Sequence, residues 1–234
     1  MLRVWNPFLD RPFLERQMDS NLPHRSLSAE APEYTAEWFN AARPVWDRLL
    51  PQLDARLVLE IGSYEGASAC YLIDVLSQKA PLEIHCIDHW KGGIEHQTAA
   101  VDMAQVEQRF LRNTAISIAN GAFPVDLHIH KGSSESCLGA LLSRQPKPQF
   151  DFIYVDGSHQ AADVLLDASM AFRLLRVGGI MVLDDYLWHE TLAGNRDPLA
   201  VPKMAIDAFI NCHFNRLRMV SAPLYQVFLQ KLVE

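Results

Sequence analysis

FDFIYVDG at residues 150–157 and RVGGIMVLDDYLW at residues 176–188 are the two most informative stretches of this chain. Each contains a short, almost wholly apolar run that ends in aspartate, which is typical of a strand buried on both faces of a parallel sheet. The segment between them predicts an amphipathic helix that ends at Gly178-Gly179, with an apolar stripe of Leu165, Ala168, Phe172 and Leu175. This strand–helix–strand order predicts adjacent parallel strands, whose carboxyl ends meet at one edge of a sheet.

Charged side chains follow both of these strands. Asp156 ends the first strand, Asp184 and Asp185 end the second, and His159 lies three residues beyond Asp156. Three carboxylates at one edge are costly in free energy unless a cationic group binds there. In the alternative interpretation, Asp156 or Asp184 caps a helix or accepts loop hydrogen bonds. His159 would then cap the helix or support Asp156.

The remainder of the chain continues this alternation of strands and helices. Further apolar strands are expected at residues 56–62, 82–90 and 125–132. Two last strands, at residues 217–222 and 224–232, are too close in sequence for a crossover and are expected to form an antiparallel pair. The pattern predicts an α/β fold with a Rossmann-like, seven-stranded, mostly parallel sheet, a C-terminal antiparallel hairpin and helices on both faces. It differs from the six-stranded dinucleotide-binding fold.

The helices expected between these strands follow apolar stripes in the sequence, and they cover residues 66–78, 97–119, 133–144 and 203–214. Before the first strand, a helical pattern starts at Ser28, and Pro44 is expected to divide it into two helices with a stripe of Trp38, Ala42, Trp46 and Leu49. Residues 1–30 are expected to be irregular because prolines interrupt them. We therefore divide the chain into a helical extension or cap, residues 1–54, and an α/β domain, residues 55–234.

The composition argues against several classes of protein. The 234 residues are 49% hydrophobic, but no apolar run reaches about 18 residues, the length of a membrane span. The formal net charge is −7 and no cluster of Lys or Arg occurs, so nucleic acid is not an expected partner. Four scattered cysteines without a C-x-x-C pair indicate buried thiols and a cytoplasmic location. The apolar N-terminal helices are compatible with a homo-oligomer interface.

A glycine-bearing turn follows the first predicted strand of the domain, with the sequence Glu60-Ile61-Gly62-Ser63-Tyr64-Glu65-Gly66. Glycine lets the backbone approach a ligand closely, and the next helix offers free N–H groups. The G-x-x-x-G spacing and the two glutamates suit a cationic or zwitterionic ligand better than a pyrophosphate. The next strand ends in Asp88, where a carboxylate can accept both hydroxyls of a ribose. After the third strand, Gly132 and Ser133 lie in a loop that could contact a base ring.

Together these features resemble the class I S-adenosylmethionine-dependent methyltransferases over residues 55–234, because Glu60-x-Gly62-x-x-x-Gly66 is similar to the first motif of that family. The resemblance implies that Gly62 and Ser63 border the methionine part of the cofactor and that Asp88 holds its ribose. Trp90 would either stack on the adenine or pack in the core. The full cofactor-binding set that the resemblance implies is Glu60, Gly62, Ser63, Gly66, Asp88, Trp90, Gly132, Ser133 and Asp156.

Within that family, the carboxylate pattern is similar to the cation-dependent O-methyltransferases that act on catechols, caffeoyl-CoA and macrolide sugars. The resemblance implies that Asp156, Asp184 and Asp185 hold a divalent cation. Oxygen ligands favour Mg²⁺ or Mn²⁺, with Ca²⁺ as a further choice, over zinc. Asp185 stands where the catechol and caffeoyl-CoA enzymes carry Asn, which favours the sugar-type branch. His159 stands where the catechol type carries a basic Lys, so His159 and Asp156 are the expected catalytic residues.

Three functions remain open at this stage. The first is S-adenosylmethionine-dependent O-methyl transfer to a small hydroxylated acceptor, such as a sugar or a phenol, with help from a divalent cation. The second is methyl transfer without a metal. The third is a non-catalytic cofactor-binding protein with the same fold. A dehydrogenase is disfavoured because the phosphate-binding glycine pattern is absent.

The predicted strands 82–90 and 125–132 contain four further histidines, of which His89 lies near the expected ligand edge. His85 alternates within the first of these strands and is expected to be packed. His128 and His130 share one face of the second strand. Because no third ligand accompanies them in the sequence, this pair is not expected to bind a metal.

Overall fold

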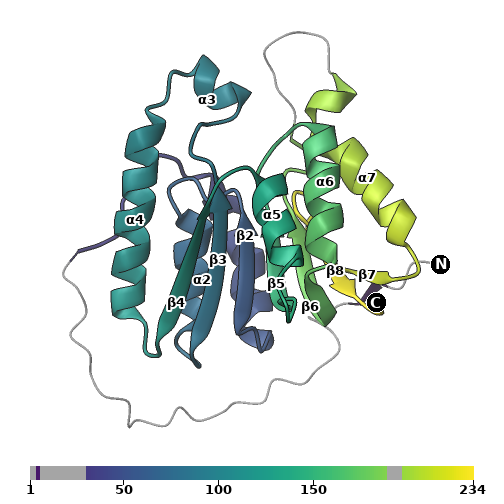
Figure 1. The fold of residues 1–234 in the computed structure, drawn as a ribbon, viewed down its shortest axis with the longest axis horizontal. Coiled ribbons are helices and arrows are strands. Elements are labelled where there is room, and N and C mark those ends of the chain that lie inside the picture. The colour runs from purple at the N-terminus through teal and green to yellow at the C-terminus, as the bar shows by residue number, and fades with distance from the viewer. Residues whose placement is uncertain (1–3, 6–29, 189–196) are drawn as a thin grey trace.

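The computed structural model describes residues 4–5, 30–188 and 197–234, which form one eight-stranded sheet with helices on both faces (Figure 1). The strands are β1 (Val4–Trp5), β2 (Leu57–Ile61), β3 (Leu82–Asp88), β4 (Val125–Lys131), β5 (Phe150–Val155), β6 (Leu175–Leu183), β7 (Leu217–Val220) and β8 (Val227–Lys231). The helices are α1 (Arg43–Leu49), α2 (Ala67–Leu76), α3 (Ile94–Thr98), α4 (Met103–Asn120), α5 (Ser134–Leu142), α6 (Ala161–Phe172) and α7 (Pro202–His213). Short 3-10 turns are η1 (Trp38–Ala41), η2 (Leu50–Gln52) and η3 (Pro198–Ala200).

The strand order is β1-β7-β8-β6-β5-β2-β3-β4. Strands β2 to β6 pair in parallel with one another, whereas β8 runs antiparallel to both β6 and β7. The seven predicted strands and the antiparallel C-terminal pair are therefore confirmed. The two-residue β1, parallel to β7, was not predicted.

Two layers of helices bury the two faces of the sheet. The core on one side includes side chains from α5, α6 and α7, which lie in front of the sheet in Figure 1, and the core on the other side includes side chains from α1, α2 and α4. Strand β5 supplies both cores in alternation: Ile153 and Val155 face the α6 side, and Phe152 and Tyr154 face the α2 side. This alternation explains why the buried strand reads as a continuous apolar run. None of the helices in the described part of the chain is both long and apolar enough to cross a membrane.

The boundary between α6 and β6 differs from the prediction. Helix α6 ends at Phe172, and β6 already begins at Leu175, so Gly178-Gly179 lies within the strand. Gly178 has a φ of +83°, and the pairing of β6 with β5 shifts in register over this segment. The glycines therefore form a strand irregularity rather than a helix stop. The buried Lys231 donates to the carbonyl oxygens of Phe172 (3.3 Å) and Leu175 (2.8 Å), which ties the end of α6 to β8.

Two other helices also differ from their predicted extents. The segment predicted as one helix over residues 97–119 is divided into α3 and α4, because Asp102 caps α4 by accepting from the N–H groups of Ala104 (3.1 Å) and Gln105 (3.3 Å). The helix expected from Ser28 starts only at Trp38, and Pro44 lies in the first turn of α1 rather than between two longer helices.

The described part of the N-terminal segment packs into the core of the domain. Trp46 on α1 is fully buried, and its ring packs edge-on against Phe152 (5.4 Å) and Tyr154 (4.9 Å) of β5. Its indole N–H donates to Oε1 of Gln226 at 2.8 Å. By contrast, Trp38 is 66% exposed. Of the two tryptophans, Trp46 therefore stabilises the fold.

We expect Trp46→Ala to lower the free energy of unfolding by about 3–5 kcal/mol, because it removes a large core side chain and leaves the Gln226 amide without its donor. Trp38→Ala is the matched control and should change the same quantity by about 1 kcal/mol or less. Urea denaturation followed by circular dichroism measures both changes. Equal losses in the two variants would contradict this assignment of the core.

Candidate functional site

The site lies at the carboxyl edge of the sheet, in the loops that follow β2, β3, β5 and β6. Three residues other than glycine in these loops have a positive φ: Tyr64 (47°), Trp90 (48°) and Asp185 (57°). Such backbone conformations cost about 1–3 kcal/mol each and concentrate at functional sites. Their position here, after three different strands, marks this edge as the functional part of the fold.

Gly62 lets the turn after β2 pass directly against the end of β5. Its φ is +85°, and a Cβ at this position would lie 2.0 Å from the carbonyl oxygen of Asp156. Its N–H donates to the carbonyl of Ile87 on β3 at 2.9 Å. Any other residue would push these strand ends apart, so glycine is required here for the close approach of two backbone segments. Gly66, with φ +84°, then starts α2.

Glu60 is a fully buried carboxylate that is only half satisfied. Its Oε1 accepts from the Ser68 hydroxyl at 2.5 Å, whereas Oε2 has no hydrogen-bond partner among the described residues. Burial raises the pKa of Glu60 to about 7. Glu65 behaves differently, because Arg109 pairs with it at 2.5 Å. Of the two glutamates in the turn, Glu60 is thus the one that a cationic or N–H-bearing ligand group would stabilise.

Asp88 organises the loops on both sides of it. Its Oδ2 accepts from the backbone N–H groups of Ser63 and Tyr64, each at 3.0 Å, and Oδ1 accepts from that of Trp90 at 2.7 Å. A carboxylate has about four acceptor positions, so a ribose hydroxyl can still be bound. This loop-holding role was not visible in the sequence.

Trp90 is packed inside the protein. It is 5% exposed, its ring lies 5.0 Å from that of Phe110, and its indole N–H donates to the carbonyl of Tyr64 at 3.0 Å. This placement favours core packing over adenine stacking, the two roles considered for it.

Gly132 and Ser133 lie next to the Asp88 turn. The N–H of Gly132 donates to the carbonyl of Asp88 at 3.0 Å. The hydroxyl of Ser133 caps α5 by accepting from the N–H of Ser136 at 3.4 Å. The loop after β4 is therefore adjacent to the loop after β3, as the adenine-side interpretation requires.

The carboxylates of Asp156 and Asp184 meet at one phenol. The hydroxyl of Tyr154 is 2.9 Å from Oδ2 of Asp156 and makes a short hydrogen bond to Oδ2 of Asp184. Gln226 also donates to Oδ2 of Asp184 at 2.7 Å. Partial desolvation and the charge of Asp184 raise the pKa of Asp156 well above its usual range, and partial desolvation and the charge of Asp185 raise the pKa of Asp184 to about 6. Asp184 is half-buried and Asp156 is exposed, so a cation from solvent could reach this concentration of negative charge and would relieve it.

Asp185 and His159 form the second contact of the site. Nε2 of His159 lies 2.9 Å from Oδ2 of Asp185, and the imidazole stacks on Trp188 with 3.8 Å between ring centroids. The predicted residues therefore lie together as two contacting pairs, Asp156 with Asp184 and Asp185 with His159. In the described part of the chain, the group of three metal-ligating side chains with ligand atoms within 4.8 Å of one another is a different one, Glu83, His85 and His128.

Two residues of the site escaped the sequence analysis. Tyr154 precedes Asp156 by two positions and shares its strand face, a signal that the alternation of the strand contained. Gln226 comes from the start of β8, and no local pattern connects it to Asp184. The antiparallel pairing of β8 with β6 brings it there.

Comparison with known proteins agrees with this geometry. The methyltransferase-domain family model matches residues 59–186, which is more than half of the chain. A caffeoyl-CoA O-methyltransferase from Populus kitakamiensis is 23% identical over 171 residues, which cover 72% of this chain. This chain spans 63% of the length of that relative.

Solved structures show the same fold. The O-methyltransferase TomG from Streptomyces achromogenes, in complex with S-adenosylmethionine, has a TM-score of 0.51 at 18% identity, over 76% of this chain and 74% of that chain. The MycE methyltransferase of the mycinamycin pathway has a TM-score of 0.51 at 18% identity, over 86% of this chain and 51% of that chain. With the family match over residues 59–186, they confirm the resemblance seen in the sequence: the chain belongs to the methyltransferase-domain family.

Proposed function

We propose that this protein transfers the methyl group of S-adenosylmethionine to a hydroxyl group of a small acceptor, with assistance from a divalent cation. The observation that carries the proposal is the close contact between Asp156 and Asp184, which share the Tyr154 hydroxyl and have raised pKa values. Such crowding is unfavourable in the isolated protein and becomes favourable when a cation binds between the carboxylates.

The turn after β2 fits the cofactor. Gly62 lets the turn lie against the end of β5, and Glu60 offers a buried carboxylate oxygen without a partner among the described residues to the positively charged end of the cofactor. Asp88 retains acceptor capacity for the ribose. Gly132 and Ser133 would border the adenine.

The carboxylate pair fits a hard cation. Its donors are oxygen atoms only, which favours Mg²⁺ or Mn²⁺, with Ca²⁺ as a further choice. MycE is described in complex with Mg, S-adenosylhomocysteine and mycinamycin VI. When bound, such an ion lowers the pKa of an acceptor hydroxyl and orients it. Asp156 and Asp184 would hold the ion, while Asp185 stays paired with His159 and contributes its charge to the same edge.

His159 is the proposed general base. Its imidazole takes the proton of the acceptor hydroxyl, and the carboxylate of Asp185, 2.9 Å away, stabilises the imidazolium that forms. Trp188 fixes the ring by stacking on it. The deprotonated oxygen then attacks the methyl group in line, and the alignment of the two reactants supplies much of the rate.

The acceptor is a hydroxylated small molecule, a phenol or a sugar. Aromatic rings gather beside the turn after β2. The ring centroid of Tyr64 lies 5.0 Å from that of Trp38 and 5.1 Å from that of His96. The exposed ring of Trp38 suits a planar or glycosylated molecule. The caffeoyl-CoA relative and the macrolide bound by MycE represent these two chemistries.

A second function, methyl transfer without a metal, is favoured by one observation. The carboxylate of Asp185 is paired with His159 and does not join those of Asp156 and Asp184. In that case Tyr154 and Gln226 would neutralise the pair by hydrogen bonding alone.

Asp88→Ala should weaken binding of S-adenosylhomocysteine by about 10-fold or more, because it removes the ribose acceptor and releases three backbone N–H groups. Asp184→Asn is the matched control and should change this affinity by about threefold at most. Isothermal titration calorimetry with Mg²⁺, and again with EDTA, measures both affinities. Equal losses in the two variants would contradict the separate roles of these aspartates.

The effect of Mg²⁺ on stability should depend on pH. The pKa of Asp184 is about 6 in the folded protein, against about 4 in an unfolded chain. Between about pH 4 and about pH 6 the folded state binds this proton and the unfolded state does not. Without metal, the free energy of unfolding therefore falls as the pH rises from about 4 to about 6, and above about pH 6 this loss of stability is complete. Mg²⁺ binds the deprotonated carboxylates. The increase in the protein's melting temperature on adding Mg²⁺ should therefore be small near pH 5 and several degrees near pH 8.

Differential scanning fluorimetry with Mg²⁺ and with EDTA measures this increment. Asp184→Asn should abolish it, and Asp54→Asn, an exposed aspartate outside both groups of metal-ligating side chains, should keep it. A wild-type protein that ignores Mg²⁺ at both pH values would favour the metal-free function.

His159→Ala should lower kcat by about 100-fold with little change in KM, because it removes the base and keeps the binding groups. Free imidazole should restore part of the rate by entering the space beside Trp188. Transfer of labelled methyl groups to catechol, caffeoyl-CoA and nucleotide sugars measures the rates, with His213→Gln as the control. Unchanged turnover in His159→Ala would remove it as the base.

A further inference from the structure

A cluster of metal-ligating side chains lies on the face of β3 and β4, away from the carboxyl edge. Glu83 and His85 alternate on β3, and they pair in register with Asp126 and His128 on the edge strand β4. The four side chains therefore share one face of the sheet. His85 is buried against the edge of Phe150, whereas Glu83 is 47% exposed and His128 is 36% exposed. An ion could reach this cluster from solvent.

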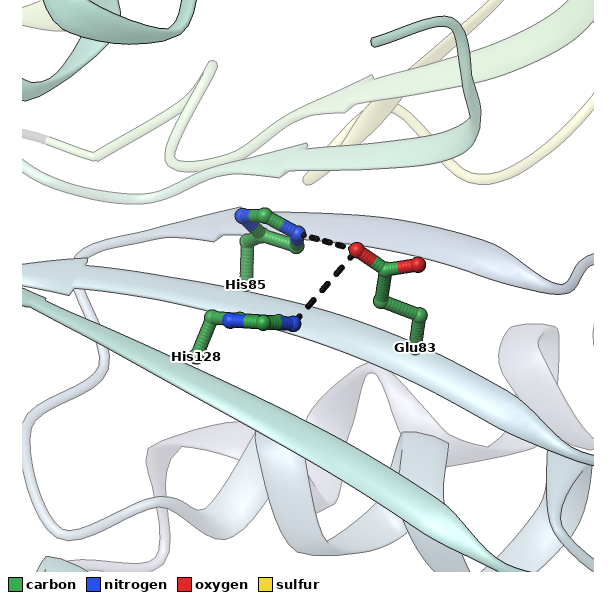
Figure 2. Close-up of side chains that lie close together, drawn as sticks. All are labelled: Glu83, His85 and His128. Atoms are coloured by element: carbon green, nitrogen blue, oxygen red, sulfur yellow. Dashed lines mark hydrogen bonds and ion pairs between the residues drawn. The ribbon is translucent and has the colours of Figure 1, made fainter.

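The ligand atoms converge at distances that suit one ion. Oε1 of Glu83 is 2.9 Å from Nε2 of His85 and 3.4 Å from Nε2 of His128, as the dashed lines in Figure 2 show. Zinc binds such atoms at about 2.0–2.1 Å in tetrahedral geometry, which separates any two ligand atoms by about 3.3 Å. The observed spacings are close to the edges of that tetrahedron. The two imidazoles stack with 4.4 Å between ring centroids, so both rings stand on the same side of Glu83.

The side chain of His128 has a buried nitrogen that no hydrogen bond within the described residues satisfies. Its Nε2 is buried and makes no hydrogen bond of good geometry, although Oε1 of Glu83 (3.4 Å) and Oδ2 of Asp126 (3.2 Å) both lie near it. A ring nitrogen between two carboxylates without a hydrogen bond is the arrangement that a shared cation would complete. Two carboxylates also balance the charge of a divalent ion.

His130 holds the buried ligand in place from behind. Its Nε2 lies 2.8 Å from Nδ1 of His85, which leaves Nε2 of His85 directed at Glu83. Metal-binding histidines typically have their second nitrogen fixed by such a partner.

We propose that Glu83, His85 and His128 form a second metal site, for a divalent transition ion of the zinc type, with Asp126 as an additional carboxylate ligand. Imidazole nitrogen and carboxylate oxygen suit zinc better than magnesium. The ion would join β3 to the edge strand β4. These strands lead into Asp88 and Gly132, so the ion would stiffen the strand pair below the cofactor edge without taking part in methyl transfer.

The test is titration of Zn²⁺ into the EDTA-treated full chain that carries Asp184→Asn, which separates this site from the carboxylate site. We expect one equivalent to bind. Adding His128→Gln or Glu83→Gln should weaken binding by about 100-fold, since each removes one of the proposed ligands. Both side chains are partly exposed, so the variants should fold, and circular dichroism verifies this. Adding His213→Gln, which removes an imidazole from α7, should leave the affinity unchanged and controls for adventitious binding by the nine histidines.

Co²⁺ gives a second readout, because its visible absorption is strong only in a four- or five-coordinate site. The band should appear in the Asp184→Asn protein and disappear on adding His128→Gln. Absence of binding, or equal affinity in all variants, would overturn the proposal. Binding of S-adenosylhomocysteine should be the same in the protein with and without His128→Gln, so failure of this site and failure of the proposed function are distinguishable.

Discussion

The candidate site depends on the contact of Asp156 and Asp184 through the hydroxyl of Tyr154. One phenol has one proton to donate, so it cannot satisfy two carboxylates by itself. The protein supplies a second donor from the other end of the chain, Gln226, whose amide is oriented by the indole of Trp46. Helix α1, two central strands and the last strand therefore meet at this contact. The N-terminal segment consequently supports the site as well as the core.

The sheet was predictable because burial on both faces leaves a strong mark in the sequence. Strands such as β5 alternate between two cores and so have almost no polar positions. Strand β1 could not be predicted in this way, because two residues are too few to form an apolar run. The end of α6 was misplaced because a glycine pair marks a helix stop and a strand irregularity equally well. Only the pairing of β6 with β5 distinguishes the two.

The site was predictable where one residue acts through its backbone or through the end of its strand. Gly62 is required by a contact with the next strand end, and Asp88, Asp156 and Asp184 follow from the common edge of parallel strands. Side-chain direction was not predictable. Asp185 has a φ of 57°, which sends its carboxylate to His159 rather than to Asp156. Trp90 likewise turns inward on a positive φ and packs on Phe110.

The histidine cluster on β3 and β4 was also not predictable, because its ligands come from two strands. Reading His128 and His130 along one strand gave two imidazoles and no third ligand, so a metal pair was rejected. The third ligand lies across the sheet, because the register of β3 against β4 sets His85 opposite His128 and Glu83 opposite Asp126. His130 then acts behind His85 instead of beside His128. A ligand set composed across strands is invisible until register is known, and this one differs in kind from the all-oxygen pair at the carboxyl edge. The chemical type of the donor atoms would therefore decide which ion each site binds: nitrogen and oxygen at the histidine cluster, and oxygen alone at the carboxylate pair.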